Sequence, residues 1–432
     1  MKSVSPLEGG AGASKRIVLV CQHFYPEMVS TGIHMTELTT RLTELGWDVT
    51  VYCAKPSWGA EADERHQVDK EIVYEGVRVR RVGTVGRHRG SLVSRGIFAV
   101  SFMFAVAGRL LADRGGYDGL VITTNPPFLG VLGWFLARLL KKPYMLIVYD
   151  VYPDIAIKLG ILSPRSLLTR GWALATRLML GGASVLVVIG RDMAEIVRKK
   201  VPRNFRGNLV LIPNWSDERH VRPVPSAQNP FREQHQLDHH FVVQYAGRLG
   251  RTHNVESLLD AARLLSNTNV VFQFIGDGWK KDRLESLASE LGLDNVRFLP
   301  YQPMDCLPQM LSAADLAVVC LESAFSGLSV PSKAYGVMAA GTPILGLLDP
   351  GSEIGRVINE TGCGVTLTDP DGNRIAAFIR DLMVDATKRS SMGEAGRQAF
   401  LGRYTLAHAA QAYDAALSAM LGGPRTVGGA GW

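Results

Sequence analysis

The segment RIVLVCQHFYPEMVSTGIHMTELTTRLTELGWDVTVYCA, residues 16–54, contains a strand, a helix and a second strand in succession. Its apolar runs at 16–24 and 48–54 are continuous, whereas residues 34–46 carry apolar side chains at helical spacing. Continuous apolar strands are typical of a parallel sheet that helices cover on both faces. This segment therefore predicts the first βαβ unit of an α/β fold.

The same alternation continues through the chain, with one interruption. A polar, Pro-rich stretch at 215–230 separates two series of strands, so we interpret it as an interdomain linker. The strands expected before and after it are 117–127, 143–154, 184–190, 208–214, 241–250, 270–278, 295–301, 315–321 and 364–369. The pattern predicts two doubly wound α/β domains in series, with ligands bound beyond the carboxyl ends of the strands, in the cleft between the domains.

Composition supports two folded domains and an anionic partner. The chain has 432 residues, of which 47% are hydrophobic, and a formal net charge of +7. No Lys/Arg block contains interleaved aromatic residues, so we expect no nucleic-acid partner. The five cysteines are widely spaced, which favours reduced thiols and no metal site.

One apolar segment, residues 96–108, lies between Arg95 and Arg109. It is shorter than the ~20 apolar residues that span a bilayer, so we expect no spanning helix. Two interpretations remain: a buried helix packed on a sheet, or a helix that lies on a membrane surface with its arginines at the headgroups.

Two loops that follow strands predict anion binding. In residues 25–35, Thr31 and Gly32 stand where backbone N–H groups begin a helix, although an N-capping turn has the same pattern. In residues 245–254, Arg248 ends a strand, and Arg251 and His253 follow it closely. Arginine forks suit phosphate oxygens, although surface loops also carry arginines.

Two further loops follow later strands. The turn Gly276–Asp277–Gly278 permits close backbone approach to a ligand, and Tyr301 could wall a nucleobase. The stretch ESAFSGLSVPSKAYGVMAAGTPIL, residues 322–345, joins a Gly/Ser/Pro loop to a helix start. It predicts a platform for an anionic, hydroxyl-rich ligand, or else a tight βα turn. Its candidate donor-binding residues are Glu322, Ser329, Val330, Ser332 and Lys333.

A pair of carboxylates follows the strand at 143–154. Asp150 and Asp154 could accept hydrogen bonds from sugar hydroxyls, or orient an acceptor as a base, with Tyr149 beside them. Asp154 follows Pro153, so it could instead cap the next helix.

These motifs together resemble a known family. YAGRLG, FIGDG, NVRFLPY and PSKAYGVMAAGTPIL resemble the nucleotide-binding domain of retaining GT-B glycosyltransferases of family 4. QHFYPEMVSTGIHMTEL, TTNPP and DVYPDIAIKLGIL resemble the bacterial subgroup that builds exopolysaccharide, colanic acid and O-antigen on lipid carriers. The resemblance covers residues 16 to about 420 and implies a GT-B fold, two Rossmann-like domains that face each other across a cleft.

The resemblance implies a division of the chain and a reaction. The expected parts are a tail (1–15), an acceptor-binding domain (16–214), a nucleotide-sugar-binding domain (215–402) and a helix that crosses back to the first domain (403–421). The implied reaction moves a sugar, with retention, from a UDP-sugar, or secondly a GDP-sugar, to a lipid-linked saccharide. No cofactor and no metal are expected, and the implied location is cytoplasmic, at the inner face of the membrane.

The resemblance also assigns roles to residues. Arg248, Asp150 and His253 are the expected catalytic residues, and Asp154 and Tyr149 bind the acceptor. The donor-binding set comprises Thr31, Gly32, Arg251, Gly276, Asp277, Gly278, Tyr301, Glu322, Ser329, Val330, Ser332 and Lys333.

The sequence departs from the family at three positions. His253 stands where relatives carry a lysine, and its charge is expected to depend on pH near neutrality. Leu328 and Gly336 replace the two glutamates of the family motif, the second of which usually holds the ribose. Three alternatives therefore remain: a nucleotide-sugar 2-epimerase, a non-catalytic sugar-nucleotide binder, and an NAD-dependent oxidoreductase, which the absent GxGxxG disfavours.

Overall fold

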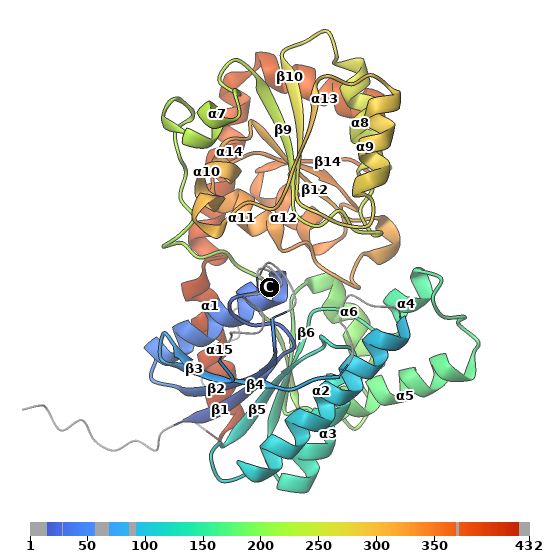
Figure 1. Ribbon diagram of the computed structural model, residues 1–432, viewed down its shortest axis with the longest axis vertical. Helices are drawn as coiled ribbons and strands as arrows, with labels where there is room; N and C mark the ends of the chain where they lie inside the picture. The colour runs from blue at the N-terminus through green and yellow to red at the C-terminus, as the bar shows by residue number, and fades with distance from the viewer. Residues whose placement is uncertain (1–14, 28, 57–68, 86–91, 369–370, 423–432) are drawn as a thin grey trace, which may run out of the picture. The chain divides into compact units, whose positions relative to one another are not determined.

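The computed structural model describes residues 15–27, 29–56, 69–85, 92–368 and 371–422 (Figure 1). The chain divides into two compact units, each described here by itself. Unit 1 comprises Met1–Ile147, Ala183–Val185 and Asp414–Trp432, and unit 2 comprises Val148–Gly182 and Leu186–Tyr413. The predicted tail lies outside the described residues except for residue 15, and the predicted domain limits remain predictions.

The first sheet has β1 (Arg16–Val20) at its centre, paired in parallel with β2 (Asp48–Ala54) and β5 (Gly119–Thr123). Its order is β3-β4-β2-β1-β5-β6-β7-β8. The last three strands are β6 (Tyr144–Val148), β7 (Val185–Val188) and β8 (Asn208–Leu211). Residues 17–20 of β1 are buried, which confirms the parallel, helix-covered sheet expected from its continuous apolar run.

An edge hairpin in this sheet was not expected from the sequence. β3 (Glu71–Tyr74) pairs antiparallel with β4 (Val77–Val82). Glu75 and Gly76, with φ of 46° and 83°, form the turn between them. β3 has the sequence EIVY and lies at the sheet edge with Glu71 and Val73 exposed, so it is too short and too exposed to resemble a buried strand.

The apolar helix of unit 1 is longer than predicted. α2 (Leu92–Ala112) has 21 residues and extends beyond the predicted segment 96–108 at both ends, so the shortness of that segment does not decide whether the helix spans a membrane. By length and composition alone, Val93–Ala112 could cross a membrane. One of its faces is nevertheless packed in unit 1, through Phe98, Phe102, Val106 and Leu110. α2 lies beside β4 and α3 (Leu129–Leu140), as Figure 1 shows.

Unit 2 contains a six-stranded sheet of order β11-β10-β9-β12-β13-β14, with all printed pairs parallel. Its strands are β9 (Phe241–Ala246), β10 (Val270–Ile275), β11 (Val296–Leu299), β12 (Leu316–Cys320), β13 (Ile344–Leu347) and β14 (Gly364–Thr366). One core joins this sheet to α8 (Glu256–Leu264), α9 (Lys281–Glu290) and α13 (Gly372–Val384). α11 (Lys333–Ala339) packs on β12 and β13 and contacts α14 (Ala386–Arg403).

The remaining helices connect or flank these layers. They are α1 (Ser30–Glu44), α4 (Asp154–Lys158), α5 (Leu167–Gly182), α6 (Arg191–Lys200), α7 (Pro230–Gln234), α10 (Leu307–Ser312), α12 (Glu353–Thr361) and α15 (Leu406–Met420).

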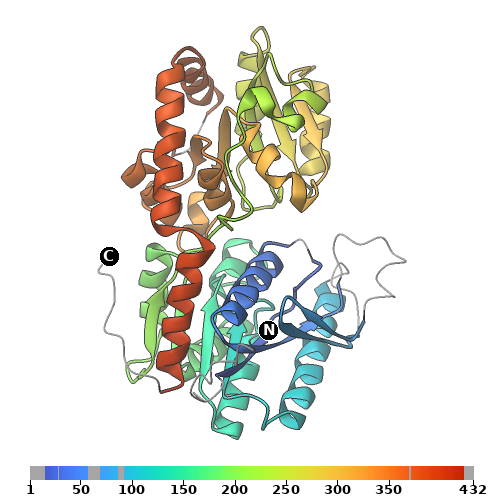
Figure 2. The same cartoon turned by 90° about the vertical axis from the view of Figure 1, so that its left-hand side faces the viewer.

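The C-terminal end of α15 belongs to unit 1, where Figure 2 shows it in red. Asp414 accepts a hydrogen bond from Trp47 Nε1 at 2.8 Å and lies 3.9 Å from Lys15 Nζ. Leu417 is fully buried. Residues from the two ends of the chain therefore form one core.

Candidate anion-binding site

The loops that follow β9 and β10 meet at one edge of the unit 2 sheet, because the two strands are parallel neighbours. Backbone hydrogen bonds tie the loops together. Gly247 N–H donates to the Ile275 carbonyl at 2.8 Å, and Leu249 N–H donates to the Asp277 carbonyl at 3.0 Å. The loop edge is therefore preorganised.

Two glycines make this close approach of the loops possible. A Cβ at Gly276 would lie 2.2 Å from the Gly247 carbonyl oxygen, and a Cβ at Gly278 would lie 2.4 Å from the Leu249 carbonyl oxygen. Both residues also have positive φ, 137° and 156°. Only glycine suits both demands, which agrees with the close-approach turn expected at Gly276 and Gly278.

Lys333 brings a buried cation to this edge. Its Nζ lies 3.6 Å from the ring centroid of Tyr245 and beside Gly247, where a Cβ would come within 3.2 Å of it. The Nζ atom is buried and has no hydrogen-bond partner among the described residues. Burial lowers the pKa of Lys333 to about 8. An unpartnered buried ammonium group favours an anionic ligand.

His253 lies next to the same cation. Burial first, and then the charge of Lys333, lower the pKa of His253 to about 3. The histidine is therefore neutral at neutral pH, and the expectation that its charge changes near neutrality is wrong for this structure. It can donate or accept a hydrogen bond, but it does not replace the positive charge of the family lysine.

Arginines and a tyrosine surround the exposed side of the site. Arg248 is exposed just beyond β9, and its carbonyl accepts a hydrogen bond from the Tyr245 hydroxyl at 2.7 Å. The pKa of Tyr301 is raised by burial, with smaller and opposite effects from Arg248 and Asp277. Arg251 lies 4.4 Å from the ring of Trp279, a cation–π contact that directs it to the surface.

Lys280 is a site residue that the sequence reasoning missed. Its Nζ donates to the His253 carbonyl at 2.7 Å and lies 3.0 Å from Glu256 and 3.8 Å from Glu322. Glu322 is thus placed beside the loop, where its N–H also donates to the Thr252 carbonyl at 2.9 Å. The signal in the sequence was the lysine pair that follows Gly-Asp-Gly.

The loop before α11 meets the residues that follow β6. The Leu328 carbonyl accepts a hydrogen bond from Val151 N–H at 2.9 Å. Asp150 is hydrogen-bonded to Ser329, which partly offsets the rise that burial causes in the pKa of Asp150. Val330 is buried. Asp150 and Ser329, predicted separately as catalytic and donor-binding residues, are therefore neighbours.

The remaining positions that the sequence singled out in unit 2 are the predicted acceptor-binding residues and two positions at α11. Asp154 forms a 2.7 Å ion pair with Lys200, Tyr149 is buried, and Ser332 immediately precedes the seven-residue α11. At the family glutamate position, Gly336 carries no charge, and a Cβ there would meet Leu311 at 3.3 Å.

Thr31 and Gly32 belong to unit 1, in the first turn of α1. A Cβ at Gly32 would approach the Glu27 carbonyl oxygen to 3.0 Å. Below this turn, His23 Nδ1 and Glu27 Oε2 are 2.6 Å apart and buried, a pair that sequence reasoning did not single out. Their spacing of four residues in QHFYPEM was the available signal.

Comparisons with known proteins agree with this arrangement. Residues 227–399 match the family model "Glycosyl transferases group 1", and residues 31–215 match "Glycosyl transferase 4-like domain". The structure of Anabaena Alr3699/HepE in complex with UDP and glucose has a TM-score of 0.71 at 15% identity, covering 94% of this chain and 100% of that chain. With its two largely parallel sheets covered by helices, the chain has a GT-B fold, that of a glycosyltransferase.

Relatives identified by sequence similarity show to which glycosyltransferase family the chain belongs. "Probable glycosyltransferase WbjE" of Pseudomonas aeruginosa is 35% identical over 68% of this chain and 73% of its own length. WcaI of Escherichia coli K12, a protein named for colanic acid biosynthesis, is 25% identical over 85% of this chain and 92% of its own length. The chain belongs to glycosyltransferase family 4.

Proposed function

We propose that this glycosyltransferase moves a sugar from a UDP-sugar, with GDP as the second choice of base, to a hydroxyl of a lipid-linked saccharide. The reaction retains the configuration of the anomeric carbon and needs no metal ion or other cofactor. The enzyme works in the cytoplasm, at the inner face of the membrane.

The observation that carries this proposal is the unpartnered, buried Nζ of Lys333 beside the glycine-lined ends of β9 and β10. A nucleoside diphosphate would give this ammonium group the negatively charged partner that it lacks among the described residues. The choice of UDP is supported by the complex of HepE with UDP and glucose. The basic net charge and the apolar α2 support a lipid-linked acceptor at a membrane.

In the proposed mechanism the leaving diphosphate gains charge as its bond to the anomeric carbon breaks. Arg248 and Lys333 stabilise that charge in place of a metal ion, while neutral His253 contributes a hydrogen bond. The leaving phosphate takes the proton of the acceptor hydroxyl, which attacks from the same face, so configuration is retained. Asp150 orients the acceptor hydroxyl.

The first test is a thermal-shift panel with UDP, GDP, ADP, dTDP and NAD, each with and without Mg²⁺. A ligand that binds only the folded chain raises the melting temperature, because it adds to the free energy of unfolding. At a ligand concentration a hundred times the Kd, this addition is about 2.7 kcal/mol. We expect UDP to raise it most, equally without Mg²⁺. No shift with any diphosphate would overturn the proposal.

Incubation with the donor alone and with acceptor distinguishes the remaining activities. Transfer gives a product whose anomeric configuration, read by NMR, matches that of the donor. An epimerised nucleotide sugar formed without acceptor would identify a 2-epimerase instead. Nucleotide binding without turnover on any lipid-linked acceptor would identify a non-catalytic binder.

A further inference from the structure

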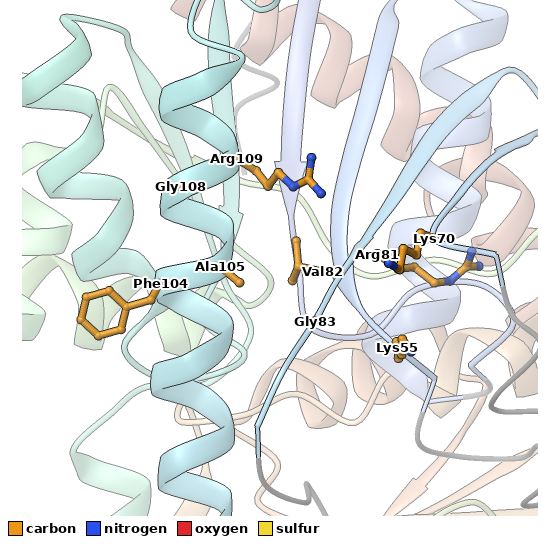
Figure 3. A pocket seen from close by; sticks show the side chains of 9 residues that line it. All are labelled: Lys55, Lys70, Arg81, Val82, Gly83, Phe104, Ala105, Gly108 and Arg109. Carbon is orange, nitrogen blue, oxygen red and sulfur yellow. The ribbon is translucent and has the colours of Figure 1, made fainter.

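Unit 1 contains a pocket of about 440 Å³ between β4 and α2 (Figure 3). Four of its lining side chains are cationic: Lys55, Lys70, Arg81 and Arg109. Among the residues that the structure describes, no carboxylate lines the pocket, and none of the four cations forms an ion pair with a carboxylate. The pocket therefore concentrates positive charge.

Arg81 is the buried cation of this pocket, and backbone carbonyls hold it in place. Its side chain is buried, and its two terminal nitrogens donate to the Asp69 and Tyr25 carbonyls, each at 2.9 Å. Its Nε has no hydrogen-bond partner among the described residues. Carbonyl oxygens orient a guanidinium group but do not neutralise it, so an anion in the pocket would complete its environment.

The other wall of the pocket is α2, whose solvent-facing side is also apolar. We call the exposed residues Val93, Ile97, Val100, Phe104 and Leu111 the outer stripe. They recur at helical spacing, opposite the buried Phe98, Phe102, Val106 and Leu110, and Phe104 is 75% exposed. A surface helix normally carries polar residues on this side, so the outer stripe marks an interaction surface.

The pocket and the outer stripe lie on adjacent sides of one helix. Arg109 extends from α2 toward β4, whereas the ring of Phe104, a residue that also lines the pocket, points to the opposite side of the helix (Figure 3). The residues between them are small: Ala105 and Gly108, and a Cβ at Gly108 would have no atom within 4 Å. A flexible chain can cross α2 there.

We propose that this pocket binds the diphosphate of a long-chain lipid diphosphate, while the hydrocarbon chain crosses α2 at Gly108 and lies along the outer stripe. The charge favours this occupant over an ordinary phospholipid, because a diphosphate group carries at least two negative charges, even with a sugar attached to its far end, whereas a phosphodiester headgroup carries one. The diphosphate therefore matches four cations better. That this lipid carries the sugar acceptor rests on the proposed function, whereas its binding does not.

The test is vesicle flotation with the full chain and no nucleotide sugar. Three vesicle types are compared: phosphatidylcholine alone, phosphatidylcholine with a polyprenyl diphosphate, and phosphatidylcholine with phosphatidylglycerol at equal surface charge. We expect the strongest binding to the polyprenyl diphosphate vesicles, with release by excess inorganic diphosphate. Lys55→Gln/Lys70→Gln/Arg109→Gln should weaken that binding on the order of 100-fold, at roughly fivefold per cation.

Matched variants separate the pocket from general effects. Lys199→Gln/Arg203→Gln/Arg206→Gln removes three exposed cations of unit 2 and should leave the binding unchanged. Val100→Ser/Phe104→Ser should weaken the binding tenfold or more, whereas the exposed pair Val384→Ser/Leu401→Ser should not. All four variants change exposed side chains, so their melting temperatures should stay near that of the wild type.

Three results would overturn the proposal. One is equal binding to phosphatidylglycerol vesicles that inorganic diphosphate does not reverse. A second is a pocket variant that binds as well as its control. A third is a concentration-dependent dimer that Val100→Ser/Phe104→Ser abolishes without any vesicle binding, since the outer stripe would then bind a second copy. In each case a retained thermal shift with UDP would leave the proposed transferase function standing.

Discussion

Lys333 couples nucleotide binding to pH. Its pKa of about 8 in the free protein must rise when a diphosphate binds beside it, because the cation is then stabilised. We expect affinity for UDP to be full below pH 8 and to fall as pH rises above it, by at most about tenfold per unit. Calorimetric titration between about pH 7 and pH 9.5 measures this. A Lys333→Met variant should bind UDP weakly at every pH, without the fall in affinity above pH 8. If this variant kept that fall, the pH dependence would belong to another group.

His253 makes the folded state sensitive to acid. Its pKa is about 3 in the folded state, against about 6.5 in an unfolded chain, so below pH 6.5 the unfolded state binds the extra proton. Stability is therefore lost as pH falls from 6.5 toward 3. Between pH 6.5 and 4.5 the wild type should lose roughly 2 kcal/mol more unfolding free energy than His253→Gln.

Urea unfolding at several pH values measures this difference. The exposed His239 supplies the control, and His239→Gln should follow the wild type. Parallel curves for the wild type and His253→Gln would mean that the imidazole is not held neutral by its surroundings.

Arg248 should matter for turnover and not for folding, because it is exposed beyond β9. We expect Arg248→Ala to lower the transfer rate by ~100-fold or more, the loss seen when one charge-stabilising donor is removed. The control is Arg283→Ala, which removes an exposed arginine of α9. Initial transfer rates at saturating donor measure this contribution. Near-normal turnover of Arg248→Ala would show that Arg248 is not a catalytic residue.

The identities of these residues were predictable, but their electrostatic states were not. The motifs YAGRLG and PSKAYG pointed to Arg248 and Lys333, and both lie at the expected strand edge or helix start. The neutrality of His253 depends on its burial and on Lys333, which is eighty positions away in the sequence. Likewise, the hydrogen bond between Asp150 and Ser329 required the fold.

At the scale of elements, the two loops after β9 and β10 act as one preformed cradle. Gly276→Ala would place a Cβ 2.2 Å from the Gly247 carbonyl oxygen, so the loops must separate. We expect it to lower the melting temperature and to weaken UDP binding at least tenfold, at a cost of roughly 1–3 kcal/mol.

Gly292→Ala is the matched control. Gly292 also has positive φ, 61°, but a Cβ there meets nothing within 4 Å. It should cost about 1 kcal/mol of stability and leave UDP affinity unchanged. If both variants bind UDP equally well in an isothermal titration, the close approach of the loops is not needed for the ligand.

Strands buried on both faces were easy to predict, and elements with a mixed environment were not. β2 has the predicted limits, 48–54, because only Asp48 and Thr50 are polar and every residue after Asp48 is buried. β3 is a four-residue edge strand, and β4 carries Arg78, Arg80 and Arg81 among its valines, so neither strand shows a continuous apolar run. The limits of α2 were missed because Arg95 and Arg109 bound its apolar run, although the helix continues through both.

At the scale of the whole molecule, the core of unit 1 needs residues from both ends of the chain. Leu417→Ala, at a fully buried position near the C-terminus, should lower the unfolding free energy by roughly 2–5 kcal/mol. Ser418→Ala, which removes only the 2.8 Å hydrogen bond from Lys15, should cost less than about 1 kcal/mol.

Denaturant unfolding followed by the fluorescence of Trp47, whose indole N–H bonds Asp414, reports on this core. The other tryptophans are replaced by phenylalanine in both variants and in the reference. A loss below about 0.5 kcal/mol in Leu417→Ala would show that the C-terminal end of α15 does not stabilise unit 1.

The shared core of unit 1 also has a consequence during synthesis. Ribosomes release unit 1 as far as Ile147 early, but the residues from Asp414 onward that complete it emerge 267 positions later. At the usual rate of translation this delay lasts roughly 13–53 s. Throughout it, the apolar surface that Leu417 later covers stays open on the nascent chain. We therefore expect the nascent chain to need holding chaperones during this interval, and slow translation of the second half to prolong that need.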